Sequence, residues 1–240
     1  MSSPQPPNPN DYQSYLWAYA PRMPQVGVPP KKYCFVTIGA TAAFDTLIKG
    51  CFQPDVLAAL AATGYTNLLV QYGKDGKPLF DELVKSTAGS SSIKIDGFGF
   101  SQYGLVEHMK LVKGSPLDGS NEGLVVSHAG ALHRQDLSTI LSQSSNSAPG
   151  SGSILDALRL NVPLVVVPNP SLLDNHQLEL AEVLEQQGYV VHGKLDNLVP
   201  AIQEAERLRQ KIRSWPPINS SDRAAHGLQG VMDEEMGFLD

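Results

Sequence analysis

The chain of 240 residues contains only two cysteines, Cys34 and Cys51. Two cysteines provide neither a disulfide framework nor the spacing of a zinc site, so they favour a reducing compartment. No stretch approaches the roughly 20 apolar residues that a membrane-spanning helix needs. Residues 1–13 also lack the basic and apolar regions of a signal peptide. If the protein works at a membrane, we therefore expect another molecule to hold it there.

An excess of positive charge is missing as well. The sequence has 18 lysines and arginines against 24 acidic residues, a formal net charge of -6 and an isoelectric point near 5.5. Such a balance argues against a protein that binds nucleic-acid phosphates by bulk charge. We therefore expect no nucleic-acid partner.

The two ends of the chain differ in composition from its middle. Residues 1–30 are rich in proline and show little periodic apolar pattern, which predicts a disordered leader. Residues 214–240 are polar and predict a flexible tail. Residues 31–213 are therefore expected to form a single domain.

Short apolar runs alternate with helical patterns in this domain. The runs are apolar throughout, which is typical of strands buried on both faces of a parallel sheet. The sequence thus predicts an α/β fold, a Rossmann-like parallel sheet with helices on both faces. The expected strands are 33–39, 66–73, 93–100, 123–130, 163–168 and 189–193, and the expected helices are 42–64 (broken near Pro54), 104–112, 153–160, 174–188 and 195–213.

The expected helix 195–213 carries apolar residues at spacings of three and four, from Leu198 through Ile202, Ala205 and Leu208 to Ile212. This stripe indicates one buried face. Two interpretations stay open: the stripe packs on the chain's own sheet, or it docks on a partner.

Ligand sites in such sheets lie outside the carboxyl ends of the strands. After the first strand, Gly39, Ala40 and Thr41 form a turn of small residues, whose backbone N–H groups could approach a phosphate. The turn is neither a Walker loop nor a complete GxGxxG fingerprint. A tight turn without a ligand is therefore an equal alternative.

The fourth expected strand ends in Ser127, His128, Ala129 and Gly130. Val125 stands where a nucleophile elbow needs glycine, which disfavours a serine hydrolase. His128 could serve as a general base, as a donor to phosphate, or as a hydrogen-bonded structural residue.

Two further turns precede expected helices. Gly152 and Ser153 could cap a helix or bind a diphosphate, and Asp156 is placed one turn later to accept hydrogen bonds from ribose hydroxyls. The amide and imidazole donors of the second turn, at residues 175–177, suit sugar hydroxyls better than a metal, since no second histidine or acid stands at ligand spacing. We therefore expect no metal and no cofactor. This second turn contributes Asn175, His176 and Gln177.

Three segments together resemble one enzyme family: FVTIGAT at 35–41, GLVVSHAG at 123–130, and the stretch 150–191 that contains LLDNHQLELA. They resemble the catalytic subunit of the asparagine-linked glycosylation UDP-N-acetylglucosamine transferase. That subunit is similar to the C-terminal, donor-binding half of the bacterial N-acetylglucosaminyltransferase that makes lipid II. The resemblance covers roughly residues 33–200.

The resemblance implies one half of a glycosyltransferase B fold. The implied reaction moves GlcNAc from UDP-GlcNAc to dolichyl-diphosphate-GlcNAc with inversion, a step of dolichol-linked oligosaccharide synthesis for N-glycosylation. It further implies a membrane-anchored, acceptor-binding partner subunit of the Alg14 type. That partner would hold this chain at the cytoplasmic face of the endoplasmic reticulum.

The resemblance also implies roles for individual residues. The turn at 39–41 would face the diphosphate or the acceptor, and Asp156 would bind the ribose. His176 and Gln177 would bind GlcNAc. His128 and His176 are candidates for the general base, which could instead lie on the partner. The nucleotide and its phosphates would be held by Ser127, His128, Gly130, Gly152 and Ser153.

In the family the SHAG turn runs almost directly into the next helix, whereas here the 20 residues 131–150 intervene. Three interpretations stay open: an unspliced intron or a faulty gene model, a tolerated loop beside an intact site, and a loss of catalysis. The last leaves an alternative function, a non-catalytic nucleotide-sugar-binding or regulatory subunit.

Overall fold

The fold is taken from a computed structural model of the chain. It describes residues 30–39, 43–101, 104–115, 117–129, 153–170, 176–186 and 188–214. Residues 1–29, 131–150 and 215–240, on which the predictions of a leader, an inserted loop and a tail fall, lie outside the described residues.

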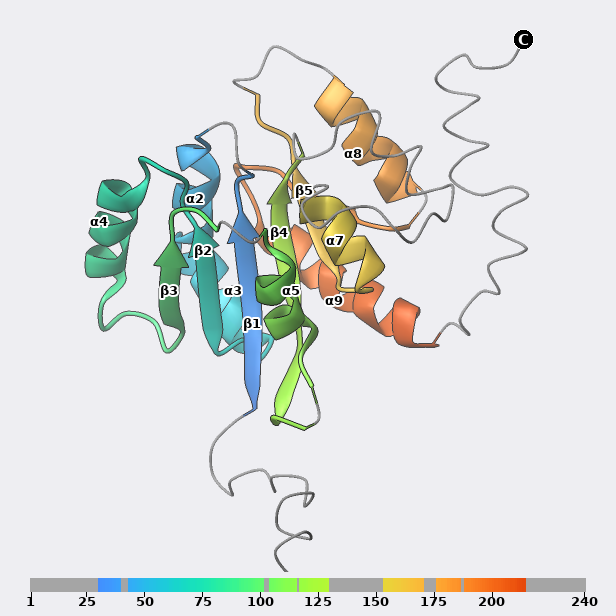
Figure 1. Cartoon of the computed structure of the whole chain (residues 1–240), viewed down its shortest axis with the longest axis horizontal. Coiled ribbons are helices and arrows are strands. Elements are labelled where there is room, and N and C mark those ends of the chain that lie inside the picture. The colour runs from blue at the N-terminus through green and yellow to red at the C-terminus, as the bar shows by residue number, and fades with distance from the viewer. Residues whose placement is uncertain are drawn as a thin grey trace, which may run out of the picture.

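The described chain builds one six-stranded sheet in the order β3-β2-β1-β4-β5-β6, and every pair of neighbouring strands is parallel. Helices cover both faces (Figure 1). This confirms the predicted Rossmann-like fold. The strands are β1 (Lys31–Thr37), β2 (Asn67–Gln71), β3 (Lys94–Phe98), β4 (Ser120–His128), β5 (Leu164–Val167) and β6 (Val191–His192); the helices are α2 (Asp45–Cys51), α3 (Pro54–Ala62), α4 (Lys77–Thr87), α5 (Val106–Lys113), α7 (Ser153–Arg159), α8 (His176–Gln186) and α9 (Val199–Ser214).

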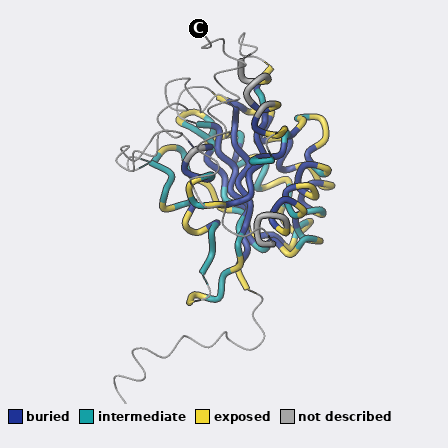
Figure 2. Tube along the Cα trace, turned by 90° about the vertical axis from the view of Figure 1, so that its right-hand side faces the viewer, coloured by how far each residue is buried: buried dark blue, intermediate teal, exposed yellow. Residues whose placement is uncertain are grey.

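The side chains of the central strands point alternately to the two faces of the sheet, and each face has its own hydrophobic core. On one face, Val36 and Val126 pack with buried residues of α2, α3 and α9. On the other face, Phe35 and Val125 pack with buried residues of α5, α7 and α8. Figure 2 shows the central strands as the most continuously buried part of the chain. The strand interiors are apolar because both of their faces are covered.

Two local predictions can be compared with this arrangement. The helix expected at 42–64 is divided into α2 and α3, and Pro54 occupies the first turn of α3, where its missing N–H costs nothing. The apolar stripe of α9 is buried against the chain's own sheet, since Ile202, Ala205 and Leu208 all belong to the first core. The interpretation that the stripe packs on its own sheet is therefore confirmed for these residues.

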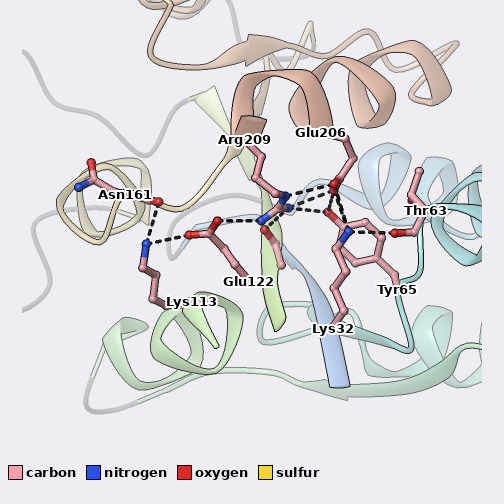
Figure 3. A network of polar contacts seen from close by, with 9 residues as sticks. Lys32, Thr63, Tyr65, Lys113, Glu122, Asn161, Glu206 and Arg209 are labelled. Carbon is pink, nitrogen blue, oxygen red and sulfur yellow. Dashed lines mark hydrogen bonds and ion pairs between the residues drawn. The ribbon is translucent and has the colours of Figure 1, made fainter. Parts of the chain in front are cut away.

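A buried ionic network fastens α9 to the amino-terminal edge of the sheet (Figure 3). The guanidinium of Arg209 donates to Glu206 at 3.0 Å, to Glu122 of β4 at 3.1 Å and to the carbonyl of Gly123 at 2.6 Å. Glu206 also accepts from Lys32 of β1 at 3.1 Å. One helix is thus tied to two neighbouring strands.

Tyr65 completes the network from the turn before β2. Its hydroxyl donates to Glu206 at 2.5 Å and accepts from Arg209 at 3.1 Å. Burial raises the pKa of Tyr65, which keeps the hydroxyl a donor. Burial would also raise the pKa of Glu206, but hydrogen bonds from Arg209 and Tyr65 and the neighbouring positive charges outweigh it and hold that pKa below its usual value.

We expect replacement of Arg209 by methionine to lower the free energy of unfolding by about 3 kcal/mol, because it leaves the Glu206 and Glu122 carboxylates without their buried partner. Urea denaturation measures this change. The matched control is Arg207→Met, two residues earlier on the same helix, where the side chain is 71% exposed and pairs with Glu204. Exposed pairs contribute about 0.5 kcal/mol. Equal losses in the two variants would contradict a stabilising role for the network.

Candidate functional site

The strand order reverses between β1 and β4, which are neighbours in the sheet although β2 and β3 separate them in sequence. In a doubly wound sheet, such a reversal opens a crevice at the carboxyl ends of the strands. Here Thr37, the last residue of β1, is the register partner of Ser127 in β4. The two turns that follow these strands therefore begin side by side.

Ser127 joins β4 to the helix that follows it. Its hydroxyl lies 2.8 Å from the hydroxyl of Ser153, the first residue of α7, and also donates to the carbonyl of His128 at 3.2 Å. Both serines are buried. The residues that flank segment 131–150 are thus held together by a direct hydrogen bond, although they stand 26 positions apart.

His128 lies on the opposite face of the sheet from Ser127. Its side chain is 4% exposed, and its ring meets Phe44 edge to face with the ring centroids 5.1 Å apart. Phe44 directly precedes α2 and belongs to the first core. Adjacent residues at the end of β4 thus contact the beginnings of two different helices, α7 and α2.

Asp156 lies in the first turn of α7, one turn after Ser153, and is only 5% exposed. Burial raises the pKa of this carboxyl, and Arg159, whose Nη1 lies 3.7 Å from Oδ1, offsets part of the rise.

Gly39 begins the turn after β1 with φ of +79°, a left-handed conformation that favours glycine. Its N–H donates to the Thr37 hydroxyl at 3.3 Å. The Thr37 hydroxyl in turn bonds to the side-chain oxygen of Gln71, at the carboxyl end of β2. Gly39, the first residue of the small-residue turn, is therefore held by Thr37, which is itself held by Gln71.

Five of the predicted site residues are described, after β1, at the end of β4 or in the first turn of α7. The side chains of His176 and Gln177 lie outside the description, although both residues stand in the first turn of α8. The positions outside the described residues are Ala40, Thr41, Gly130, Gly152 and Asn175. The five placed residues are Gly39, Ser127, His128, Ser153 and Asp156.

Sequence reasoning missed three buried residues at this edge. Gln71 pairs with Thr37, Phe44 contacts His128, and Asn169 is buried just after β5. A signal existed for Gln71, because a glutamine at the end of an otherwise apolar strand needs a hydrogen-bond partner. For Phe44 the local sequence offers no signal, since its partner lies 84 positions away.

The described residues contain neither a cluster of metal-ligating side chains nor a membrane-spanning helix. No group of three or more histidines, cysteines, aspartates or glutamates there could hold a metal ion. None of the described helices combines the length and the apolar character needed to cross a bilayer.

Comparison with known proteins identifies relatives over most of the chain. Residues 147–225 match the family model of the glycosyltransferase family 28 C-terminal domain. "UDP-N-acetylglucosamine transferase subunit ALG13" of Saccharomyces cerevisiae is 33% identical over 172 residues, which are 69% of this chain and 79% of that protein. The subunit of the same name from Cryptococcus neoformans is 33% identical over 85% of this chain and 96% of its own length.

A solved structure is also similar. An NMR solution structure of ALG13 is 26% identical and covers 80% of this chain and 91% of its own, with a TM-score of 0.49. The sequence relatives, with their long coverage, carry the comparison.

The buried carboxylate of Asp156 should reduce stability at neutral pH. A carboxyl whose pKa is raised in the folded state causes no loss below its ordinary pKa, near 4, and its full loss above the raised pKa. We therefore expect Asp156→Asn to raise the thermal midpoint at pH 7, with the gain disappearing as the pH falls toward 4. Thermal unfolding across this pH range measures the effect.

The matched control is Asp55→Asn, which removes an exposed acid from the first turn of α3. That change relieves no burial and should give no gain. A midpoint for Asp156→Asn that falls at pH 7 would show that the carboxylate stabilises the fold.

Proposed function

The chain belongs to the ALG13 family of UDP-N-acetylglucosamine transferase subunits, and from this we propose that it is the donor-binding, catalytic subunit of a heteromeric N-acetylglucosaminyltransferase. The observation that supports the proposal is that β1 and β4 end side by side where the strand order reverses, with Ser127 of β4 bonded to Ser153 at the start of α7. Nucleotides bind at this place in doubly wound sheets.

The proposed reaction transfers GlcNAc from UDP-GlcNAc to GlcNAc-diphosphate-dolichol, the second step in building the dolichol-linked oligosaccharide for N-glycosylation. A β-linked product from an α-linked donor requires inversion, hence a single in-line displacement at the anomeric carbon. The bond between that carbon and the diphosphate breaks as the acceptor hydroxyl attacks, so negative charge gathers on the departing UDP. Backbone N–H groups of the turns can stabilise this charge without a metal ion.

The residues divide between the parts of the donor. Asp156, in the first turn of α7, accepts from the ribose hydroxyls. The turn that begins at Gly39 approaches the diphosphate through its backbone. His176 and Gln177, in the first turn of α8, bind the GlcNAc hydroxyls.

The acceptor hydroxyl also needs a general base. His128 is buried and its ring contacts Phe44, which supports a role in holding the start of α2 against the end of β4 and not one in contacting the acceptor. His176 and side chains of the acceptor-binding subunit stay as candidates for the base.

The relatives are named as subunits, which supports the presence of a partner. We propose that the partner is membrane-anchored and of the Alg14 type, that it binds the acceptor lipid, and that it holds this chain at the cytoplasmic face of the endoplasmic reticulum. An acceptor with a long lipid tail needs a binding surface at the membrane, which the partner would provide.

Co-expression of the chain with its acceptor-binding subunit tests the activity. We expect GlcNAc transfer from UDP-GlcNAc to phytanyl-diphosphate-GlcNAc by the pair, and none by either subunit alone. Deletion of residues 131–150 should preserve or increase the rate, because Ser127 and Ser153 already hold the flanking residues together. UDP binding without transfer by either version would favour the non-catalytic alternative, and absence of UDP binding would exclude both.

The role of Asp156 is tested by calorimetry with UDP. We expect Asp156→Asn to weaken UDP binding about tenfold, because an amide replaces an ionised acceptor of two hydroxyl hydrogen bonds. The control is 2′,3′-dideoxy-UDP, which lacks both ribose hydroxyls and should bind the variant and the unaltered chain equally well. A variant that discriminates between the two ligands as strongly as the unaltered chain would place the ribose elsewhere.

A further inference from the structure

Two buried polar side chains face each other at the carboxyl ends of β1 and β2. Thr37 and Gln71 are register partners in neighbouring strands, and both are buried. Their neighbours Val36 and Val70 are apolar and belong to the first core. Polar groups at such positions lose hydration on folding, so an apolar pair would fill the same space at a smaller cost. The pair therefore calls for an explanation beyond packing.

The direction of the hydrogen bonds follows from the chemistry of the groups. The Thr37 hydroxyl carries one hydrogen, and the side-chain oxygen of Gln71 can only accept. Thr37 therefore donates its hydrogen to Gln71. The lone pairs of the same hydroxyl oxygen then face the N–H of Gly39, which donates to it at 3.3 Å. Gln71 thus orients the hydroxyl, and the hydroxyl orients the Gly39 amide.

Glycine is favoured at position 39 because of its backbone conformation and not because a side chain would lack room. A Cβ added there would meet no atom within 4 Å, yet φ is +79°. A glycine in this conformation has many alternatives open to it. An external acceptor for its N–H selects one of them and so fixes the path of the chain into the turn.

We propose that Thr37 and Gln71 are positioning residues that preset the diphosphate-binding turn through the Gly39 amide. This inference rests on the proposed function, in which that turn meets the diphosphate of a nucleotide sugar. Both side chains are buried, so their proposed role is to hold the backbone and not to contact the ligand. Their effect is to hold the backbone within the few tenths of an ångström that a preorganised anion site needs.

The neighbouring strand supports this interpretation. Ser127, the other register partner of Thr37, is also buried and bonds to Ser153 at the start of α7. Three adjacent strands thus end in buried polar side chains, and two of these three hold the segment that follows their strand. The arrangement is repeated where the proposed ligand binds and matches no need of the core.

Three variants of the full chain separate positioning from simple stability. Thr37→Val removes the hydroxyl and keeps the shape, Thr37→Ser keeps the hydroxyl, and the double variant Thr37→Val with Gln71→Leu removes both partners. Replacing both partners of a hydrogen bond by apolar groups is nearly neutral for stability, whereas removing one partner leaves the other unpaired. The double variant should therefore recover the part of the thermal midpoint that the single valine variant loses by leaving Gln71 unpaired.

UDP affinity should not recover with stability, because Gly39 still lacks its acceptor in the double variant. We expect the dissociation constant to rise about five- to tenfold in both valine variants and to stay within about twofold in Thr37→Ser. A double variant that is stable and binds UDP like the unaltered chain overturns the proposal.

Amide hydrogen exchange at Gly39, followed by NMR without ligand, gives a readout that does not depend on UDP. Exchange should accelerate about tenfold in Thr37→Val and remain unchanged in Thr37→Ser. Unchanged exchange in the valine variant would refute the role of the hydroxyl. If the unaltered chain failed to bind UDP, the proposed function would fall, while this measurement would still decide whether Thr37 holds the turn.

Discussion

The reversal of strand order between β1 and β4 is the constraint on which the rest of the structure depends. Because β4 returns beside β1, their helices must leave toward opposite faces, and the two turns begin next to each other at one edge. Residues 37 and 127 become neighbours only through this reversal. The site is thus a consequence of the winding of the sheet, and each residue in it occupies a strand end or the beginning of a helix.

The two edges of the sheet use different polar chemistry. At the amino-terminal edge, the positive charges of Arg209 and Lys32 are balanced by the negative charges of Glu206 and Glu122, and these pairs hold α9 in place. At the carboxyl edge, the strand ends bond through hydroxyl and amide groups, as Thr37 and Gln71 do, and the acid proposed to bind the ribose, Asp156, lies one turn into α7. Neutral groups can fix a backbone without adding a charge that would repel an anionic ligand. The edge that anchors α9 is therefore built from charged groups, whereas the strand ends at the edge proposed to bind the diphosphate carry neutral groups.

The sequence predicted the alternation of strands and helices because apolar runs of strand length and helical stripes are local patterns. It also located the turn at Gly39 after β1 and the helix whose first turn contains Asp156. It did not predict the pairing of Thr37 with Gln71 or the contact of Phe44 with His128, since these depend on strand register and on which helix begins above which strand. Local periodicity carries no information about either. The family resemblance predicted more than the local patterns did, namely roles for individual residues, because it draws on what is known of other members of the family.

The extra segment 131–150 shows where fold and function separate. The hydrogen bond between Ser127 and Ser153 sets the ends of the connection, whatever its length. Closing a longer loop between fixed ends costs only about 0.6 kcal/mol per doubling of its length, which the two cores can tolerate. The fold therefore places almost no restriction on the segment. Catalysis places a strong one, because the nearest described residues on either side, Ala129 and Ser153, lie where the nucleotide is proposed to bind, and a preorganised site tolerates only small displacements. Whether these residues remain in the mature protein is thus a question about the site and hardly one about the fold.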